Sequence, residues 1–157
     1  MPKRHPSLVP LSRDHHDGLM LALRLRQGKK ALLQGWSHDS GWQARYVVQF
    51  HRDHLLPHFE AEERILFPVM REHAKESVGT IETLLNQHKE ITARVESLKE
   101  SEQTSLKGKL KEFGELLDRH IRIEEEDLFP AFERSIPKGI AEEVGKEIER
   151  IHKPPAK

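Results

Sequence analysis

Apolar residues recur every three or four positions along most of the chain, a spacing that places them on one face of an α-helix. No segment shows a convincing alternation of apolar and polar residues, the pattern typical of a half-buried strand. The helical pattern is clearest in a stripe formed by Ile81, Leu84, His88, Ile91, Val95 and Leu98. The sequence therefore predicts an all-α protein.

Four long helices are expected, with their ends set by glycine, proline and serine positions. The first begins near residues 10–12 and ends at about 27 or 33, and the others span about 42–75, 77–101 and 105–134. Pro57, Pro68 and Pro130 are expected to bend the second and fourth helices, because proline removes a backbone donor. A short amphipathic helix is expected at 140–151.

Four such helices joined by short loops predict an antiparallel up-down four-helix bundle. A chain of 157 residues suits a single domain, residues 1–157. The bundle core is expected at about 8–135, followed by the short helix and a tail at 138–157.

One segment occurs twice, 62 positions apart: residues 58–68 and 120–130 share the pattern His-x3-Glu-Glu-x2-Leu-Phe-Pro. In each copy a histidine and a glutamate four positions apart share a helix face, His58 with Glu62 and His120 with Glu124. Both pairs continue apolar stripes, so their side chains are directed toward the core. Two imidazoles and two carboxylates are costly to bury without partners, and a metal cluster would satisfy them.

The helix before each copy carries another histidine on its apolar stripe. His88 is the only polar member of the third stripe, and on the first helix His15 competes with His16. His15 is favoured because Leu11 and Leu19 lie one turn before and after it. A lone histidine followed by His-x3-Glu therefore occurs twice, and helix bundles commonly build two-metal sites from such pseudo-twofold halves.

The His-x3-Glu spacing alone also fits surface histidines that contact glutamates one turn away, which adds only a few tenths of a kcal/mol. The matched placement on apolar stripes favours the metal site. Without metal, the two carboxylates are expected to repel each other and to raise a glutamate pKa. Glu63 and Glu125 point about 100° away from their neighbours and are expected behind the ligands or in solvent.

The remaining histidines are expected to have other roles. His51 and His54 continue the stripe beside His58 and are expected to line a pocket or to support the ligands. Exposed positions in tails, loops or helix ends are expected for His5, His38, His73 and His152.

Composition narrows the function further. Lysine and arginine balance aspartate and glutamate at a net charge of zero, so nothing favours nucleic acid or an anionic membrane as a partner. No apolar run reaches the length of a membrane span, and we expect a cytoplasmic protein. Cysteine is absent, so any metal must be held by nitrogen and oxygen.

These motifs resemble the hemerythrin-like, or HHE cation-binding, domain family over about residues 8–132. The most specific parts are Leu11-Ser-Arg-Asp-His15, Gln87-His88 and the two copies of the duplicated segment. The resemblance implies an antiparallel four-helix bundle that holds a non-haem di-iron centre bridged by two carboxylates and an oxygen species. The ligands that it implies are His15, His58, Glu62, His88, His120 and Glu124.

The chain departs from the oxygen-carrying hemerythrins at two places. Those proteins have two histidines four apart on the third helix, where this chain has Leu84 and Thr92 around His88. They also place the last carboxylate at the position of Glu125, which leaves Glu124 and Glu125 as alternatives. Four histidines leave more positions for water or an added ligand, which weakens the case for reversible dioxygen carriage.

The sequence thus favours a protein that binds dioxygen or nitric oxide at two iron ions for sensing, redox signalling or iron handling, rather than an enzyme. Zinc or manganese would suit the same imidazole and carboxylate ligands. One alternative is a di-metal oxidase or peroxide-consuming enzyme, although that class usually has more carboxylates than histidines. Another is a regulatory module with a structural metal such as zinc.

Overall fold

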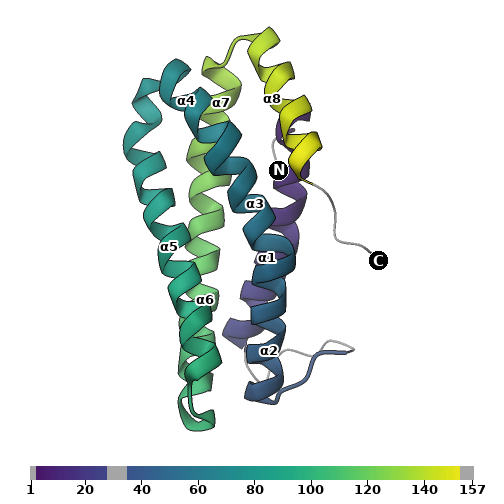
Figure 1. The fold of residues 1–157 in the computed structure, drawn as a ribbon, viewed down its shortest axis with the longest axis vertical. Coiled ribbons are helices and arrows are strands. Elements are labelled where there is room, and N and C mark those ends of the chain that lie inside the picture. The colour runs from purple at the N-terminus through teal and green to yellow at the C-terminus, as the bar shows by residue number, and fades with distance from the viewer. Residues whose placement is uncertain (1–2, 28–34, 153–157) are drawn as a thin grey trace.

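The structure is a computed structural model that describes residues 3–27 and 35–152, among which there are helices and no strands. Four long rods run up and down in turn (Figure 1). The first and third rods are α1 (Val9–Gln27) and α5 (Val78–Glu100). The second and fourth rods each consist of several successive helical segments. The second rod comprises α2 (Ser40–Phe50), η3 (His51–Leu55), α3 (Leu56–Ala61), η4 (Glu62–Leu66) and α4 (Phe67–His73). The fourth rod comprises α6 (Gln103–Ile123), η6 (Glu124–Leu128) and α7 (Phe129–Ser135).

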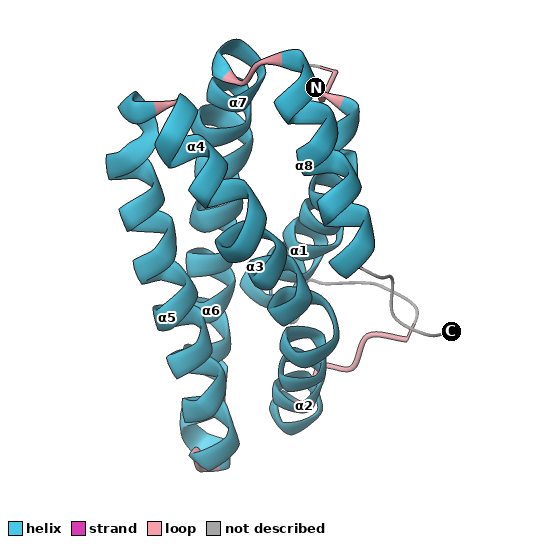
Figure 2. Cartoon of the chain, turned by 45° about the horizontal axis from the view of Figure 1, so that its top comes forward, coloured by secondary structure: helices cyan, strands magenta, loops and turns pink. Residues whose placement is uncertain are grey.

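The rods pack as an antiparallel bundle, which confirms the predicted all-α fold. α1 packs against α6, and α5 packs against both α6 and α2. A shorter fifth helix, α8 (Lys138–Ile151), lies beside the N-terminal end of the chain in both views (Figures 1 and 2). It contacts α3, η4 and the 3-10 turn η1 (Pro6–Leu8). A second 3-10 turn, η5 (Lys75–Ser77), joins α4 to α5.

Local capping explains where the second rod begins. The Asp39 carboxylate accepts a hydrogen bond of 2.8 Å from the backbone N–H of Trp42, so α2 begins at Ser40, two residues before the expected start. The possible extension of the first helix to residue 33 lies outside the described residues, as does the tail from residue 153.

A π turn precedes each internal proline of the two compound rods. The backbone N–H of Phe67 donates to the carbonyl of Glu62, and that of Phe129 donates to the carbonyl of Glu124. Proline donates no such bond, and its ring crowds the carbonyl four residues before it, so a wider preceding turn accommodates Pro68 and Pro130. Two of the three π turns therefore begin at the predicted ligand glutamates.

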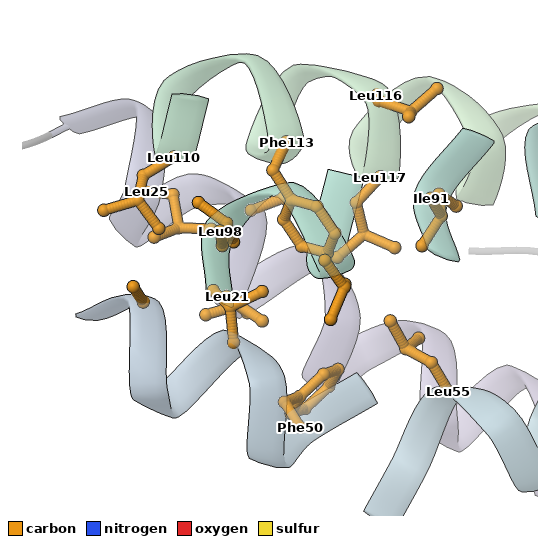
Figure 3. Packing of buried hydrophobic residues seen from close by; sticks show 14 of the residues in the cluster. Leu21, Leu25, Phe50, Leu55, Ile91, Leu98, Leu110, Phe113, Leu116 and Leu117 are labelled. Carbon is orange, nitrogen blue, oxygen red and sulfur yellow. The ribbon is translucent and has the colours of Figure 1, made fainter. Parts of the chain in front are cut away.

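The apolar core consists of two clusters stacked along the bundle. The lower cluster includes Leu21, Phe50, Leu98 and Phe113 (Figure 3), and the upper cluster includes Leu8, Phe67, Leu84 and Phe132. The predicted ligands fall between the two clusters along every rod. On α1, for example, His15 lies between Leu11 of the upper cluster and Leu21 of the lower one.

At Gly114, α6 lies close against the backbone of α1. A Cβ atom placed on Gly114 would lie 3.0 Å from the carbonyl oxygen of Ala22 and 3.1 Å from the Cβ of Leu25. A backbone oxygen in a packed helix can move very little, so α6 and α1 can pack at this distance only if residue 114 has no side chain. Gly108, on the same helix, has no neighbouring atom within 4 Å of such a Cβ.

We expect Gly114→Ala to lower the free energy of unfolding by roughly 1 kcal/mol, because overpacking outweighs the helix-propensity gain of alanine. Gly108→Ala is the matched control and is expected to raise the free energy of unfolding by up to about 1 kcal/mol. Urea denaturation of both variants measures the difference. A Gly114→Ala protein as stable as the Gly108→Ala protein would show that the α1–α6 crossing is not tight.

Candidate metal centre

The six residues that the sequence singles out lie together in one buried layer between the two apolar clusters. None of them is more than 3% exposed, and Glu62 and Glu124 are fully buried. Each rod contributes to the layer: α1, the α3–η4 segment, α5 and the α6–η6 segment. The members of the layer are His15, His58, Glu62, His88, His120 and Glu124.

Glu62 faces ligands from both halves of the chain. Its Oε1 lies 3.1 Å from Nε2 of His88, and its Oε2 lies 3.4 Å from Nε2 of His58. One carboxylate oxygen is thus directed toward each histidine. This is the arrangement that a carboxylate shared by two metal ions requires.

Glu124 occupies the corresponding place on the opposite rod. Its Oε1 lies 2.9 Å from Nε2 of His15, 3.4 Å from Nε2 of His120 and 3.6 Å from Nε2 of His58. The Nε2 atoms of three histidines therefore converge on one oxygen. The structure places Glu124, rather than Glu125, inside the layer.

Among the described residues, the donor atoms of the layer form two groups, each with its members within 4.8 Å of one another, and a third group at the edge of the layer joins Asp14 and His152 to His58. We call the two groups of the layer the first and second metal positions. The first comprises His15, His58, Glu62 and Glu124, and the second comprises Glu62, His88 and His120. Glu62 belongs to both.

Unsatisfied atoms are concentrated in this layer. Among the described side chains, six buried polar atoms have no hydrogen-bond partner, and four of them are His58 Nε2, Glu62 Oε2, His120 Nε2 and Glu124 Oε2. Each such atom costs about 1–3 kcal/mol when left alone, and a bound cation would satisfy all four. Imidazole nitrogen and carboxylate oxygen suit iron, manganese or zinc, so the residues fit a metal centre.

The outward-facing Nδ1 atom of every histidine in the layer has an oxygen partner. The pairs are His15 with Glu125 at 2.6 Å, His58 with Asp14 at 2.9 Å, His88 with Glu63 at 2.8 Å and His120 with Gln87 at 2.7 Å. Because these oxygens accept hydrogen bonds, Nδ1 carries the proton in each case. The lone pair of Nε2 is then free for a metal ion.

These outer pairs repeat the internal symmetry of the sequence. Glu63 and Glu125 each follow a ligand glutamate, and Asp14 and Gln87 each precede a lone histidine. The aromatic residue of the duplicated motif repeats as well. The Phe129 ring stacks on His15 at a centroid distance of 5.2 Å, and the Phe67 ring stacks on His88 at 5.8 Å.

Comparison with known proteins decides the family. The family model described as the hemerythrin HHE cation-binding domain matches residues 7–135. The chain belongs to this family. No curated protein and no solved structure matches the chain. Among the described helices of this HHE domain, none combines the length and the apolar character needed to cross a membrane.

Of the four histidines expected to be exposed, only His38 is; His5, His73 and His152 are partly buried. His152, at the end of α8, is not an exposed residue of the terminus: its side chain is 13% exposed, and its Nε2 bonds the same Asp14 oxygen that His58 contacts. The periodicity of α8 gives the signal for this placement, because the buried stripe Ala141, Val144 and Ile148 continues to residue 152.

The other histidines lie outside the ligand layer. His16 is exposed, so the structure places His15 rather than His16 in the site. His51 is buried and its Nε2 lies 3.1 Å from the hydroxyl of Thr92, while His54 stacks on Phe50 at 4.8 Å. The imidazole of His5 accepts a hydrogen bond from the backbone N–H of Ser7.

Without a metal ion, the pKa values of His15, His58 and His120 are shifted in different directions. Burial lowers the pKa of His15 and lowers that of His120 to about 3. Burial acts in the same direction on His58, but the charge of Glu62 and the hydrogen bond to Asp14 outweigh it and raise the pKa of His58 to about 10.

Glu62 also departs from expectation. Burial raises its pKa, but the positive charge of His58, whose Nε2 lies 3.4 Å from Oε2, and the nearby His88 ring outweigh burial and hold the pKa below its ordinary value. The metal-free layer therefore reduces repulsion by holding a proton on His58. Glu62 is therefore not the glutamate whose pKa rises.

We expect the metal-free protein to be most stable near pH 6.5, the ordinary pKa of histidine. Below it, the unfolded chain takes up protons that buried His15 and His120 do not, so stability falls as pH falls. Above it, folded His58 keeps a proton up to about pH 10 that the unfolded chain has lost, so stability falls as pH rises.

Chemical denaturation of chelator-treated protein at about pH 5, 6.5 and 8.5 measures this profile. The metal-loaded protein should lose the alkaline decline, since a ligated Nε2 carries no proton. A stability of the metal-free form that rises steadily across this range would contradict the assignment to His58.

Proposed function

We propose that this protein holds two iron ions in the buried layer and binds a small diatomic ligand, dioxygen or nitric oxide, for sensing, redox signalling or iron handling. The observation that carries the proposal is the set of four unpartnered ligand atoms divided between two donor groups that share Glu62. Bound iron would supply redox chemistry and open coordination positions. Zinc and manganese fit the same donors, and the shared carboxylate favours a metal pair.

The number of ligand atoms supports an open position. Two six-coordinate metal ions need about twelve ligand atoms. The four imidazole nitrogens and the four oxygens of Glu62 and Glu124 supply eight, which leaves places for solvent and a small ligand. Four histidines against two carboxylates also favour a binding protein over the carboxylate-rich di-iron oxidases.

The protein's own groups would hold and shield such a pair. The Nδ1 partners fix the orientation of each imidazole, and the apolar clusters above and below limit the entry of water. A surface groove between α3–η4 and α5 reaches the outer side of the layer, where it is lined by Phe59, Glu63 and His88. The Phe59 ring stacks on His88 at a centroid distance of 3.8 Å, so both rings form part of the groove wall.

We expect protein produced with ample iron to carry close to two iron atoms per chain, because two donor groups are present. His15→Ala should lower the iron content sharply by removing a ligand of the first position. His16→Ala, one residue along the same helix and exposed, is the matched control and should leave the content unchanged. Metal analysis of the purified proteins measures the iron content per chain. One zinc ion per chain without iron uptake would overturn the proposal.

The open position should admit small ligands. We expect the reduced iron protein to bind nitric oxide and the oxidised protein to bind azide, each with a change in the visible spectrum. Titration of protein shown to contain two irons, under controlled oxidation state, tests this. If neither ligand changes the spectrum, the metals are sealed in, and a structural or storage role replaces the sensing role.

A further inference from the structure

The two metal positions differ in the inner donor Glu124, which belongs to the first group, and in one outer hydrogen bond. Nδ1 of His58 donates to the carboxylate of Asp14, whereas Nδ1 of His120 donates to the amide oxygen of Gln87. Asp14 and Gln87 hold equivalent places in the two halves, each one residue before a lone ligand histidine. The pseudo-twofold symmetry of the layer is therefore broken by a charge at this pair.

The outer partners of His15 and His88 do not cancel the charge difference between Asp14 and Gln87. Glu125 and Glu63 are both carboxylates, on His15 and His88 respectively. Glu125 also accepts from the hydroxyl of Ser12 and lies 3.7 Å from the Arg4 guanidinium, which partly neutralises it. Glu63 is 47% exposed, so water screens its charge. Both charges are reduced, and the contrast of Asp14 with Gln87 remains.

A carboxylate that accepts from Nδ1 makes the imidazole more basic, and its Nε2 becomes a stronger donor once the ion has displaced the proton that metal-free His58 holds. The metal affinities of the two positions are therefore compared after allowing for the proton that His58 releases. A neutral amide fixes the ring in the same orientation but lacks the charge. The first position, with His15 and His58, therefore has two carboxylates behind its imidazoles. The second, with His88 and His120, has one carboxylate and one amide.

We propose that the two metal positions are unequal. The first position, where Asp14 lies behind His58, fills first and binds metal more tightly than the second position, where Gln87 lies behind His120. This inference rests on the proposed two-metal site. Asp14 acts here as a positioning residue through His58, and His152 on α8 holds Asp14 from the opposite side.

Titration of the metal-free protein with Zn²⁺, followed by NMR of the histidine ring nitrogens, separates the two positions. In the unmodified chain, we expect the signals of His15 and His58 to shift during the first equivalent and those of His88 and His120 during the second. Asp14→Asn should weaken the first step by about 10–100-fold, the usual effect of losing an outer partner, so that the order of filling is lost or reversed.

Two further variants complete the test. Gln87→Glu places a carboxylate behind His120 and should strengthen the second step, which decides the matter even if Asp14→Asn does not fold. Asp17→Asn makes the same chemical change at an exposed site on the same helix and should keep the original order.

The possible outcomes separate the two proposals. Uptake of two ions with all four histidines shifting together would overturn the inequality and leave the two-metal site intact. An unchanged order in both Asp14→Asn and Gln87→Glu would overturn the role of Asp14 and Gln87 in setting that order. Uptake of only one ion by the unmodified chain would overturn the two-metal site itself.

Discussion

Burial of four imidazoles and two carboxylates in one layer is the constraint on which this bundle depends. The layer divides the apolar core into an upper and a lower cluster, so the four rods must meet in one register for the polar atoms to find partners. The outer atoms achieve this with oxygen acceptors from neighbouring rods. The inner atoms remain unsatisfied in the chain alone, which makes a cation the natural complement of the fold.

The duplicated motif contributes to this layer in three ways. Its histidine and first glutamate enter the layer, its second glutamate binds a histidine on another rod, and its phenylalanine stacks on that same histidine. The π turn that begins at the first glutamate accommodates the proline that ends the motif. Side chains that the linear sequence separates by up to nine positions therefore act on one site.

Periodicity was sufficient to predict the rods and the six inward-facing residues, because both follow from which face of a helix is apolar. It placed Glu63 and Glu125 behind the ligands or in solvent, but it could not assign the outer pairs, since the pairing of His58 with Asp14 depends on how two rods are aligned. His152 was missed because its role requires α8 to dock beside η1. The lowered pKa of Glu62 also could not be foreseen, because it follows from the proton on His58, which the charge of Glu62 and the hydrogen bond to Asp14 together stabilise.

A repeated site constrains its two halves unequally. The inner residues must stay matched, because each must offer one donor atom to a shared layer. The outer residues need only accept a hydrogen bond from Nδ1, which both a carboxylate and an amide do. Asp14 and Gln87 therefore differ in charge although both accept from a ligand histidine. Asp14 also contacts the imidazole of His152 on α8, which is thus linked to the His58 ring through two hydrogen bonds. The halves of this site therefore diverge in charge and in contact with α8, while the groups that would hold the metal remain the same.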